Sequence, residues 1–160
     1  MDELKFAVIG NPVSHSLSPD IHLFFARQFQ LEHFNYTKIK SDENDFEKDI
    51  NDFFKNGGMG LNVTVPFKGL AYNLCDKLDQ SAVQCKSVNT ILIESGKLIG
   101  HSTDGQGLID DFLHREITLE DSKILIIGAG GSAASIISSL LLHGKIKEIS
   151  ILNRTKSLSL

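Results

Sequence analysis

The chain has 160 residues, enough for one domain or for one domain and part of another. Hydrophobic residues make up 41% of it and charged residues 22%, an ordinary globular composition. The net charge of −4 gives no electrostatic reason to expect nucleic acid or an anionic membrane as a partner. No apolar run approaches the ~20 residues of a membrane span, and the N-terminus lacks signal-peptide character. Two cysteines without a C-x-x-C pattern favour a reducing cytoplasm, and the histidine spacing predicts no metal site.

Residues 5–10 predict a first strand, and Ser18 followed by Pro19 predicts an N-cap and the first turn of a helix. The expected apolar face of this helix is formed by Ile21, Phe24, Phe25 and Phe29. The hydroxyls of Ser16 and Ser18 lie beside the helix N-terminus, which favours an anion such as a carboxylate. Helix capping explains the two serines equally well.

A second strand is predicted over 33–40, followed by an amphipathic helix with Phe46, Ile50, Phe53 and Phe54 on its buried face. A third strand is expected over 60–65 and a further helix over 67–74. Lys68 therefore follows a strand end, where open α/β sheets bind their ligands. A surface lysine without a function is the other interpretation of this position.

Residues 87–93 and 98–100 predict a β-hairpin that turns at 94–97. Asn89 and Thr90 are polar residues at the start of this apolar run, so we expect them to have polar partners. Asp104 stands at the N-cap or in the first turn of the next helix, where capping is the simplest role. We place a domain boundary near residues 101–106.

The stretch that follows predicts a strand, a glycine-rich turn and a helix. The four apolar residues 124–127 suit a strand that is buried on both faces. The turn has the form G-x-G-x-x-A and predicts a dinucleotide-binding site, in which backbone N–H groups approach a pyrophosphate. Its candidate cofactor-binding residues are Gly128, Ala129, Gly130, Gly131, Ser132 and Ala133.

A second strand of this unit is predicted over 148–152 and is followed by Asn153, Arg154 and Thr155. An NAD site usually ends this strand with an acidic residue that binds the ribose 2′-hydroxyl. Arg154 instead suits a 2′-phosphate, so the sequence predicts NADP(H) as the cofactor. Ordinary turn glycines and a solvated arginine are the alternative.

Six blocks occur in the order found in shikimate dehydrogenases, and the whole chain resembles that family. They are Asn11-Pro12-x-x-His15-Ser16-x-Ser18-Pro19, Asn62–Lys68, Ser87–Thr90, Thr103–Gly105, Gly128–Gly131 and Asn153–Thr155. The resemblance implies an α/β fold: an N-terminal substrate-binding domain with a mostly parallel sheet (1–103), then the first βαβ portion of a Rossmann-type NADP-binding domain (104–160).

The resemblance also implies an NADPH-dependent oxidoreductase that reversibly reduces 3-dehydroshikimate to shikimate, in the pathway to chorismate and aromatic amino acids. The substrate carboxylate would bind to Ser16 and Ser18. The catalytic pair that handles the proton would be Lys68 and Asp104. The ring hydroxyls would lie near Thr64, Lys68, Asn89 and Asp104. A monomer or a homodimer is expected.

Three departures from the family pattern matter. Ser102 stands where the family usually has Asn, which we expect to weaken a local hydrogen bond. Leu158 replaces a second phosphate-binding arginine, so Arg154, with Lys156, would hold the 2′-phosphate. This keeps open a quinate/shikimate dehydrogenase that accepts NAD. Family members continue well beyond Leu160, so we expect a truncated and inactive fragment; a non-catalytic shikimate-binding fragment is the other alternative.

Overall fold

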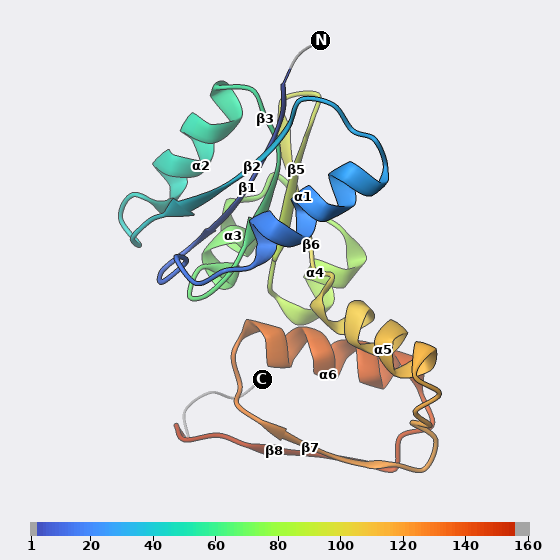
Figure 1. Cartoon of the computed structure of the whole chain (residues 1–160). Helices are drawn as coiled ribbons and strands as arrows, with labels where there is room; N and C mark the ends of the chain where they lie inside the picture. Colours follow the sequence, from blue (N-terminus) through green and yellow to red (C-terminus); the bar gives the residue numbers. More distant parts are fainter. Residues whose placement is uncertain (1–2, 156–160) are drawn as a thin grey trace.

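The computed structural model describes residues 3–155 and contains two sheets (Figure 1). The first sheet has six strands: β1 Leu4–Gly10, β2 Phe34–Lys40, β3 Gly58–Val63, β4 Lys77–Leu78, β5 Thr90–Glu94 and β6 Lys97–His101. The second has two: β7 Lys123–Ile127 and β8 Glu148–Leu152. The helices are α1 Ser18–Gln28, α2 Phe46–Lys55, α3 Lys68–Leu74, α4 Gln80–Cys85, α5 Asp104–His114 and α6 Gly131–His143.

The strand order in the large sheet is β2-β1-β3-β5-β6-β4. Strand β1 pairs in parallel with β2 and β3, and β4 pairs in parallel with β6, whereas β5 is antiparallel to both of its neighbours. The β5–β6 hairpin turns at Ser95 and Gly96, which both have positive φ. The predicted α/β fold with a mostly parallel sheet is therefore confirmed, and so is the hairpin.

Strand β1 is buried on both faces because its side chains alternate between two cores. Ala7 and Ile9 pack in the larger core with the apolar faces of α2 and α3. Val8 packs on the opposite face of the sheet with Tyr36. The predicted buried face of α2 is confirmed, since Phe46, Ile50 and Phe54 are buried and Phe53 packs against the same core.

The predicted apolar face of α1 is present, and the structure leaves it exposed. Ile21, Phe24, Phe25 and Phe29 are all exposed, and Phe29 retains 70% of its accessible surface. The buried residue of this helix is Ala26. Periodicity identifies one side of a helix, but it does not say what covers that side. Between α1 and the sheet lies an apolar groove of about 340 Å³.

Two elements of the structure were not predicted, strand β4 and helix α4. Strand β4 has only two residues, so no alternation of side chains marks it. Helix α4 begins after Asp79, whose carboxylate accepts a hydrogen bond from the backbone N–H of Ala82 at 3.2 Å. The helix spans six residues, too few for an apolar periodicity to be recognised.

The second sheet has helices α5 and α6 on one side (Figure 1). Ile124 and Ile126 of β7 pack there with buried Ile109 and Leu140 from the two helices. The apolar run suits a strand that is buried on both faces, but within residues 3–155 only one face of β7 is covered, and Ile127 on the other face keeps 78% of its surface exposed. A sheet of two strands with one helical layer leaves its opposite face open.

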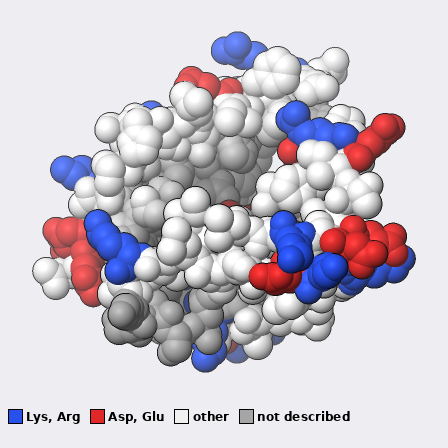
Figure 2. All heavy atoms as spheres, turned by 90° about the horizontal axis from the view of Figure 1, so that it is seen from below, with Lys and Arg blue, Asp and Glu red and all other residues white. Residues whose placement is uncertain are grey.

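The face drawn in Figure 2 carries both signs of charge, with Lys and Arg interspersed among Asp and Glu. None of the helices among residues 3–155 is long and apolar enough to cross a membrane.

Candidate functional site

The topology brings distant segments to one edge of the large sheet. Strands β1, β3 and β6 run in the same direction, so their carboxyl ends share an edge, and antiparallel β5 begins there. The loop with Ser16 follows β1, Thr64 follows β3, and Asn89 precedes β5. Thr64 is tied to the first strand by its backbone N–H, which donates to the carbonyl of Ile9 at 2.9 Å.

At this edge Lys68 forms an ion pair with Asp104. Each is the first residue of its helix, α3 for Lys68 and α5 for Asp104. The side chains retain only 12% and 25% of their accessible surface. The N-cap of α5 is Thr103, and the structure shows no side-chain cap bond there. The carboxylate of Asp104 is therefore directed to the lysine rather than to capping.

Asn89 fixes the other oxygen of this carboxylate. Its side-chain amide donates to Asp104 Oδ1 at 2.6 Å, and its carbonyl oxygen accepts from the backbone N–H of Thr103 at 3.0 Å. Asn89 is buried and also bonds Thr90, so the predicted polar partners of both residues exist. With one oxygen on Asn89 and the other on Lys68, Asp104 is held in one orientation.

Ser16 and Ser18 lie next to each other at the start of α1. The Ser16 hydroxyl donates to Ser18 Oγ at 3.1 Å and accepts from the Ser18 backbone N–H at 3.3 Å. The predicted N-cap is wrong by one residue, since Leu17 is the N-cap and makes no side-chain cap bond. Pro19 in the first turn removes one of the N–H groups that a cap would serve.

Two residues of this edge that sequence reasoning did not assign are Tyr36 and Asn62. The Tyr36 hydroxyl donates to Asn62 Oδ1 at 2.6 Å, and the Asn62 amide donates to Thr90 Oγ1 at 3.2 Å. Burial raises the pKa of Tyr36 to about 12, and the nearby Ser18 hydroxyl offsets part of this rise. A polar Asn inside an apolar strand was the available signal for Asn62. The predicted strand over 33–40 gave no signal of a polar contact for Tyr36.

The glycine-rich turn faces α3 across a cleft of about 490 Å³. Gly128 has a φ of +117°, which residues other than glycine rarely adopt. Gly130 is the N-cap of α6. A Cβ atom at either glycine would meet nothing within 4 Å, so the turn is open to a ligand. The open backbone, the helix N-terminus and the cleft together fit the pyrophosphate of a dinucleotide. Ala129 and Ala133 belong to this segment, and Ala133 lines the cleft.

Ser132 of the same turn reaches across to the ion pair. Its hydroxyl lies 2.7 Å from Lys68 Nζ and 3.0 Å from Asp104 Oδ2. The neighbouring Gly131 lies so close to the first sheet unit that a Cβ there would be 2.6 Å from Ser87 Oγ. The structure thus brings Ser132, predicted as a cofactor residue, into contact with the two residues predicted to be catalytic.

The residues after β8 lie apart from these contacts. The side chain of Asn153 donates to the carbonyl of Thr155 at 2.8 Å, and Arg154 is exposed. Lys156 and Leu158 lie outside the described residues. Ser102, expected to have a weakened hydrogen bond, is buried, and its hydroxyl donates to Ser135 Oγ at 2.8 Å.

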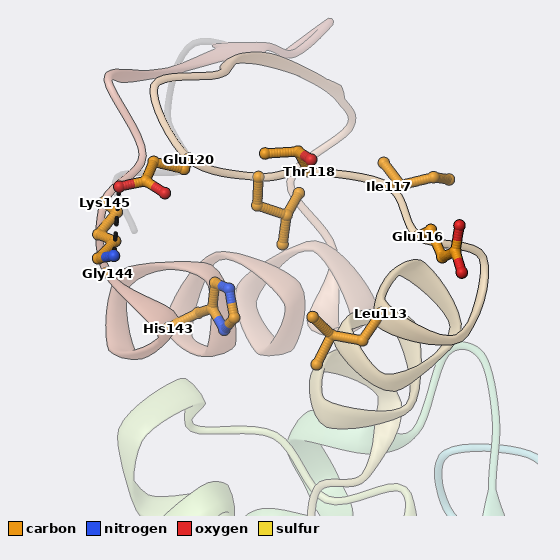
Figure 3. Close-up of a pocket in the computed structure, with 9 residues that line it drawn as sticks. Leu113, Glu116, Ile117, Thr118, Glu120, His143, Gly144 and Lys145 are labelled. Atoms are coloured by element: carbon orange, nitrogen blue, oxygen red, sulfur yellow. Dashed lines mark ion pairs between the residues drawn. The ribbon is translucent and has the colours of Figure 1, made fainter.

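A separate cavity of about 530 Å³ lies at the far ends of α5 and α6 (Figure 3). Leu113, Ile117, His143 and the ion pair of Lys145 with Glu120 line it. None of the predicted site residues lines this cavity, so it is not the candidate site.

Comparison with known proteins identifies the family of the chain. Residues 8–91 match the family model described as the shikimate dehydrogenase substrate binding domain. A shikimate dehydrogenase (NADP(+)) of Acinetobacter baylyi is 45% identical over 152 residues, which cover 95% of this chain and 57% of that protein. This chain thus spans little more than half the length of that relative.

Two solved structures are also similar to the whole chain. Shikimate 5-dehydrogenase from Thermus thermophilus, in complex with NADP(H) and shikimate, is 30% identical to this chain, with a TM-score of 0.86. The match covers 95% of this chain and 56% of the Thermus enzyme. Shikimate 5-dehydrogenase from Listeria monocytogenes, in complex with shikimate and NAD, is 31% identical to this chain, with a TM-score of 0.86. The match covers 97% of this chain and 53% of the Listeria enzyme. By its family match, its sequence and its fold, the chain belongs to the shikimate dehydrogenase family.

Proposed function

We propose that this chain carries the substrate site and the nucleotide-binding turn of an NADP-dependent shikimate dehydrogenase. The reaction is the reversible reduction of 3-dehydroshikimate to shikimate, a step toward aromatic amino acids. The observation that carries the proposal is the Lys68–Asp104 ion pair, which lies between the polar edge of the large sheet and the glycine-rich turn. The division into a substrate-binding domain (1–103) and the start of a nucleotide-binding domain (104–160) is part of this proposal.

The substrate side uses polar groups that the fold leaves available. The hydroxyls of Ser16 and Ser18 bond each other at the start of α1, and both lie close enough together to bind one carboxylate. Their place at the start of α1 adds the favourable end of the helix dipole for an anion. We assign the ring hydroxyls to Thr64, Lys68, Asn89 and Asp104.

The reduction needs a hydride at the carbonyl carbon and a proton on the carbonyl oxygen. The bound nicotinamide supplies the hydride. Lys68 donates the proton as the carbonyl oxygen becomes the new hydroxyl, and it accepts that proton in the reverse direction. Asp104 holds the lysine in place through the ion pair and is itself held by Asn89.

The cofactor side is formed by the turn and by the end of β8. The backbone of Gly128, Ala129, Gly130 and Gly131, together with Ser132 and Ala133, would surround the pyrophosphate at the N-terminus of α6. Asn153, Arg154 and Thr155 would lie at the adenosine ribose, with the Arg154 guanidinium on the 2′-phosphate. The complex of the Thermus enzyme with NADP(H) and shikimate supports NADP(H) as the cofactor.

Use of NAD is the second candidate, favoured by the Listeria complex with shikimate and NAD. The test is to express the whole open reading frame that contains these residues and to measure kcat/KM for shikimate oxidation with each nucleotide. A higher kcat/KM with NADP⁺ supports the proposal, and equal values support a dehydrogenase that also accepts NAD. Shikimate binding without turnover would leave the non-catalytic binding alternative.

We further propose that residues 1–160 alone bind shikimate weakly and turn it over poorly. Their second sheet has two strands and an open apolar face with Leu125 and Ile127 exposed. The test uses purified residues 1–160 with saturating 3-dehydroshikimate and NADPH, and it measures the loss of NADPH absorbance. Turnover by a monomer at the rate of the whole reading frame would contradict this expectation.

A further inference from the structure

Ser132 occupies an unusual position for a residue of a nucleotide-binding turn. Its hydroxyl contacts both members of the ion pair on the other side of the cleft, at 2.7 Å from Lys68 Nζ and 3.0 Å from Asp104 Oδ2. The directions of the two bonds are fixed by chemistry, since an ammonium group only donates and a carboxylate only accepts. Lys68 therefore donates to Ser132, and Ser132 donates to Asp104.

The contact is supported by close packing around it. Gly131 comes so near the first sheet unit that a Cβ would lie 2.6 Å from Ser87 Oγ and 3.2 Å from the Cβ of Lys68. Three residues after Ser132, on the same side of α6, the Ser135 hydroxyl accepts from Ser102 Oγ at 2.8 Å and from the Gly105 backbone N–H at 3.0 Å. The beginning of α6 is thus fixed against the ion pair at several successive points.

We infer that Ser132 is a positioning residue for Lys68 and Asp104, and that it links the nucleotide-binding turn to the substrate site. The two hydrogen bonds of Ser132 place it beside the ion pair. The expected effect on shikimate binding rests on the proposed function. Asn89 donates to Asp104 Oδ1 and Ser132 donates to Asp104 Oδ2. Each carboxylate oxygen therefore accepts a hydrogen bond in addition to the ion pair with Lys68. Loss of the Ser132 hydroxyl removes one partner from each member of the ion pair, so water can take its place beside Lys68 and Asp104.

The consequence is that a residue of the nucleotide-binding turn affects substrate binding when no nucleotide is present. Ser132→Ala should weaken shikimate binding about 3- to 10-fold, the range of one ordinary hydrogen bond, because Ser132 acts on shikimate only through Lys68 and Asp104. It should also lower kcat more than it raises KM for NADPH. Ser132→Thr keeps the hydroxyl at the same position on the cleft surface. This variant should restore both properties.

The matched control is Ser138→Ala, on the same helix about two turns further on. Within residues 3–155, no hydrogen bond of the Ser138 side chain is seen. All variants are made in the whole open reading frame that contains these residues. Calorimetric titration with shikimate alone gives the affinity, and the ¹⁵N signal of the Lys68 ammonium, identified by its absence in Lys68→Gln, reports the bond directly.

The inference predicts that the Lys68 signal moves or vanishes in Ser132→Ala and stays in Ser132→Thr and Ser138→Ala. The shikimate affinity should follow the same order. An unmoved signal in Ser132→Ala overturns the bond, and a moved signal with unaltered shikimate affinity overturns the positioning role. If the unaltered protein binds no shikimate while the signal still responds, the proposed function fails and the bond between Ser132 and Lys68 stands.

Discussion

Lys68 and Asp104 form an ion pair across 36 positions of sequence, and each residue begins a helix. The N-terminus of a helix disfavours an ammonium group, so the neighbouring carboxylate compensates the position of Lys68. The carboxylate of Asp104 contacts the lysine and does not cap α5, whose N-cap is Thr103. Each residue is ambiguous alone in the sequence, and the pair is a specific arrangement in the structure.

The serine pair at the start of α1 should serve the substrate and not the nucleotide. We expect the double variant Ser16→Ala/Ser18→Ala to weaken shikimate binding more than NADPH binding, because both hydroxyls are assigned to the substrate carboxylate. Calorimetric titration with each ligand measures this. Ser14→Ala in the same exposed loop is the control, and a loss confined to NADPH would refute the assignment.

Arg154 should distinguish the two nucleotides. Arg154→Ala should raise KM for NADPH well above its effect on NADH, with a loss of about 1.5–3 kcal/mol for a charge-assisted contact to the 2′-phosphate. Steady-state kinetics with both nucleotides give the two values. Arg115→Ala is the control, since Arg115 pairs with Asp111 on the surface of α5. Equal losses for NADPH and NADH would show that Arg154 does not bind that phosphate.

Two glycines of α5 should respond in opposite ways to the same substitution. A Cβ at Gly105 would clash with the carbonyl oxygen of Ser135, so Gly105→Ala should lower the free energy of unfolding by about 1–3 kcal/mol. Gly107 has nothing within 4 Å, and Gly107→Ala should raise it by about 0.5–1 kcal/mol through helix propensity. Urea unfolding measures both; a Gly105→Ala variant that is as stable as the unaltered protein would contradict the close packing of α5 on α6.

Tyr36 should ionise late. Burial raises its pKa from 10.0 to about 12. Because the folded pKa lies above the unfolded one, the contribution of Tyr36 to stability is complete below pH 10 and is lost as the pH rises toward 12. In a Tyr72→Phe background, phenolate absorbance should show one transition near pH 12, absent when Tyr36→Phe is added. A transition near pH 10 in the folded protein would show that the Tyr36 hydroxyl is hydrated.

The sequence predicted most of the architecture because local patterns determine it. Strand β8 occupies the predicted residues, and the buried face of α2 consists of the predicted phenylalanines and isoleucine. The apolar patterns of α1 and β7 do not show that one face of each element is exposed, because burial depends on what packs against an element. Periodicity reports only the side on which apolar residues lie.

The candidate site was predictable in part for the same reason. Motifs marked Lys68, Asp104 and the serines, but the contact of Ser132 with Lys68 depends on how two sheet units pack across a cleft. Nothing in the predicted strand over 33–40 indicated that Tyr36 bonds Asn62, because this contact crosses from β2 to β3. Such pairings are set by three-dimensional packing, which no local pattern reports.

The most direct test of the account is the turnover number of Lys68→Ala in the whole open reading frame, measured by NADPH oxidation with saturating 3-dehydroshikimate. Lys97→Ala, an exposed lysine at the β5–β6 turn, is the control. We expect kcat to fall by about 10²-fold or more with a much smaller change in KM, because the lysine supplies the proton in the transition state. A kcat equal to that of the control would remove Lys68 from the chemistry and contradict the proposed site.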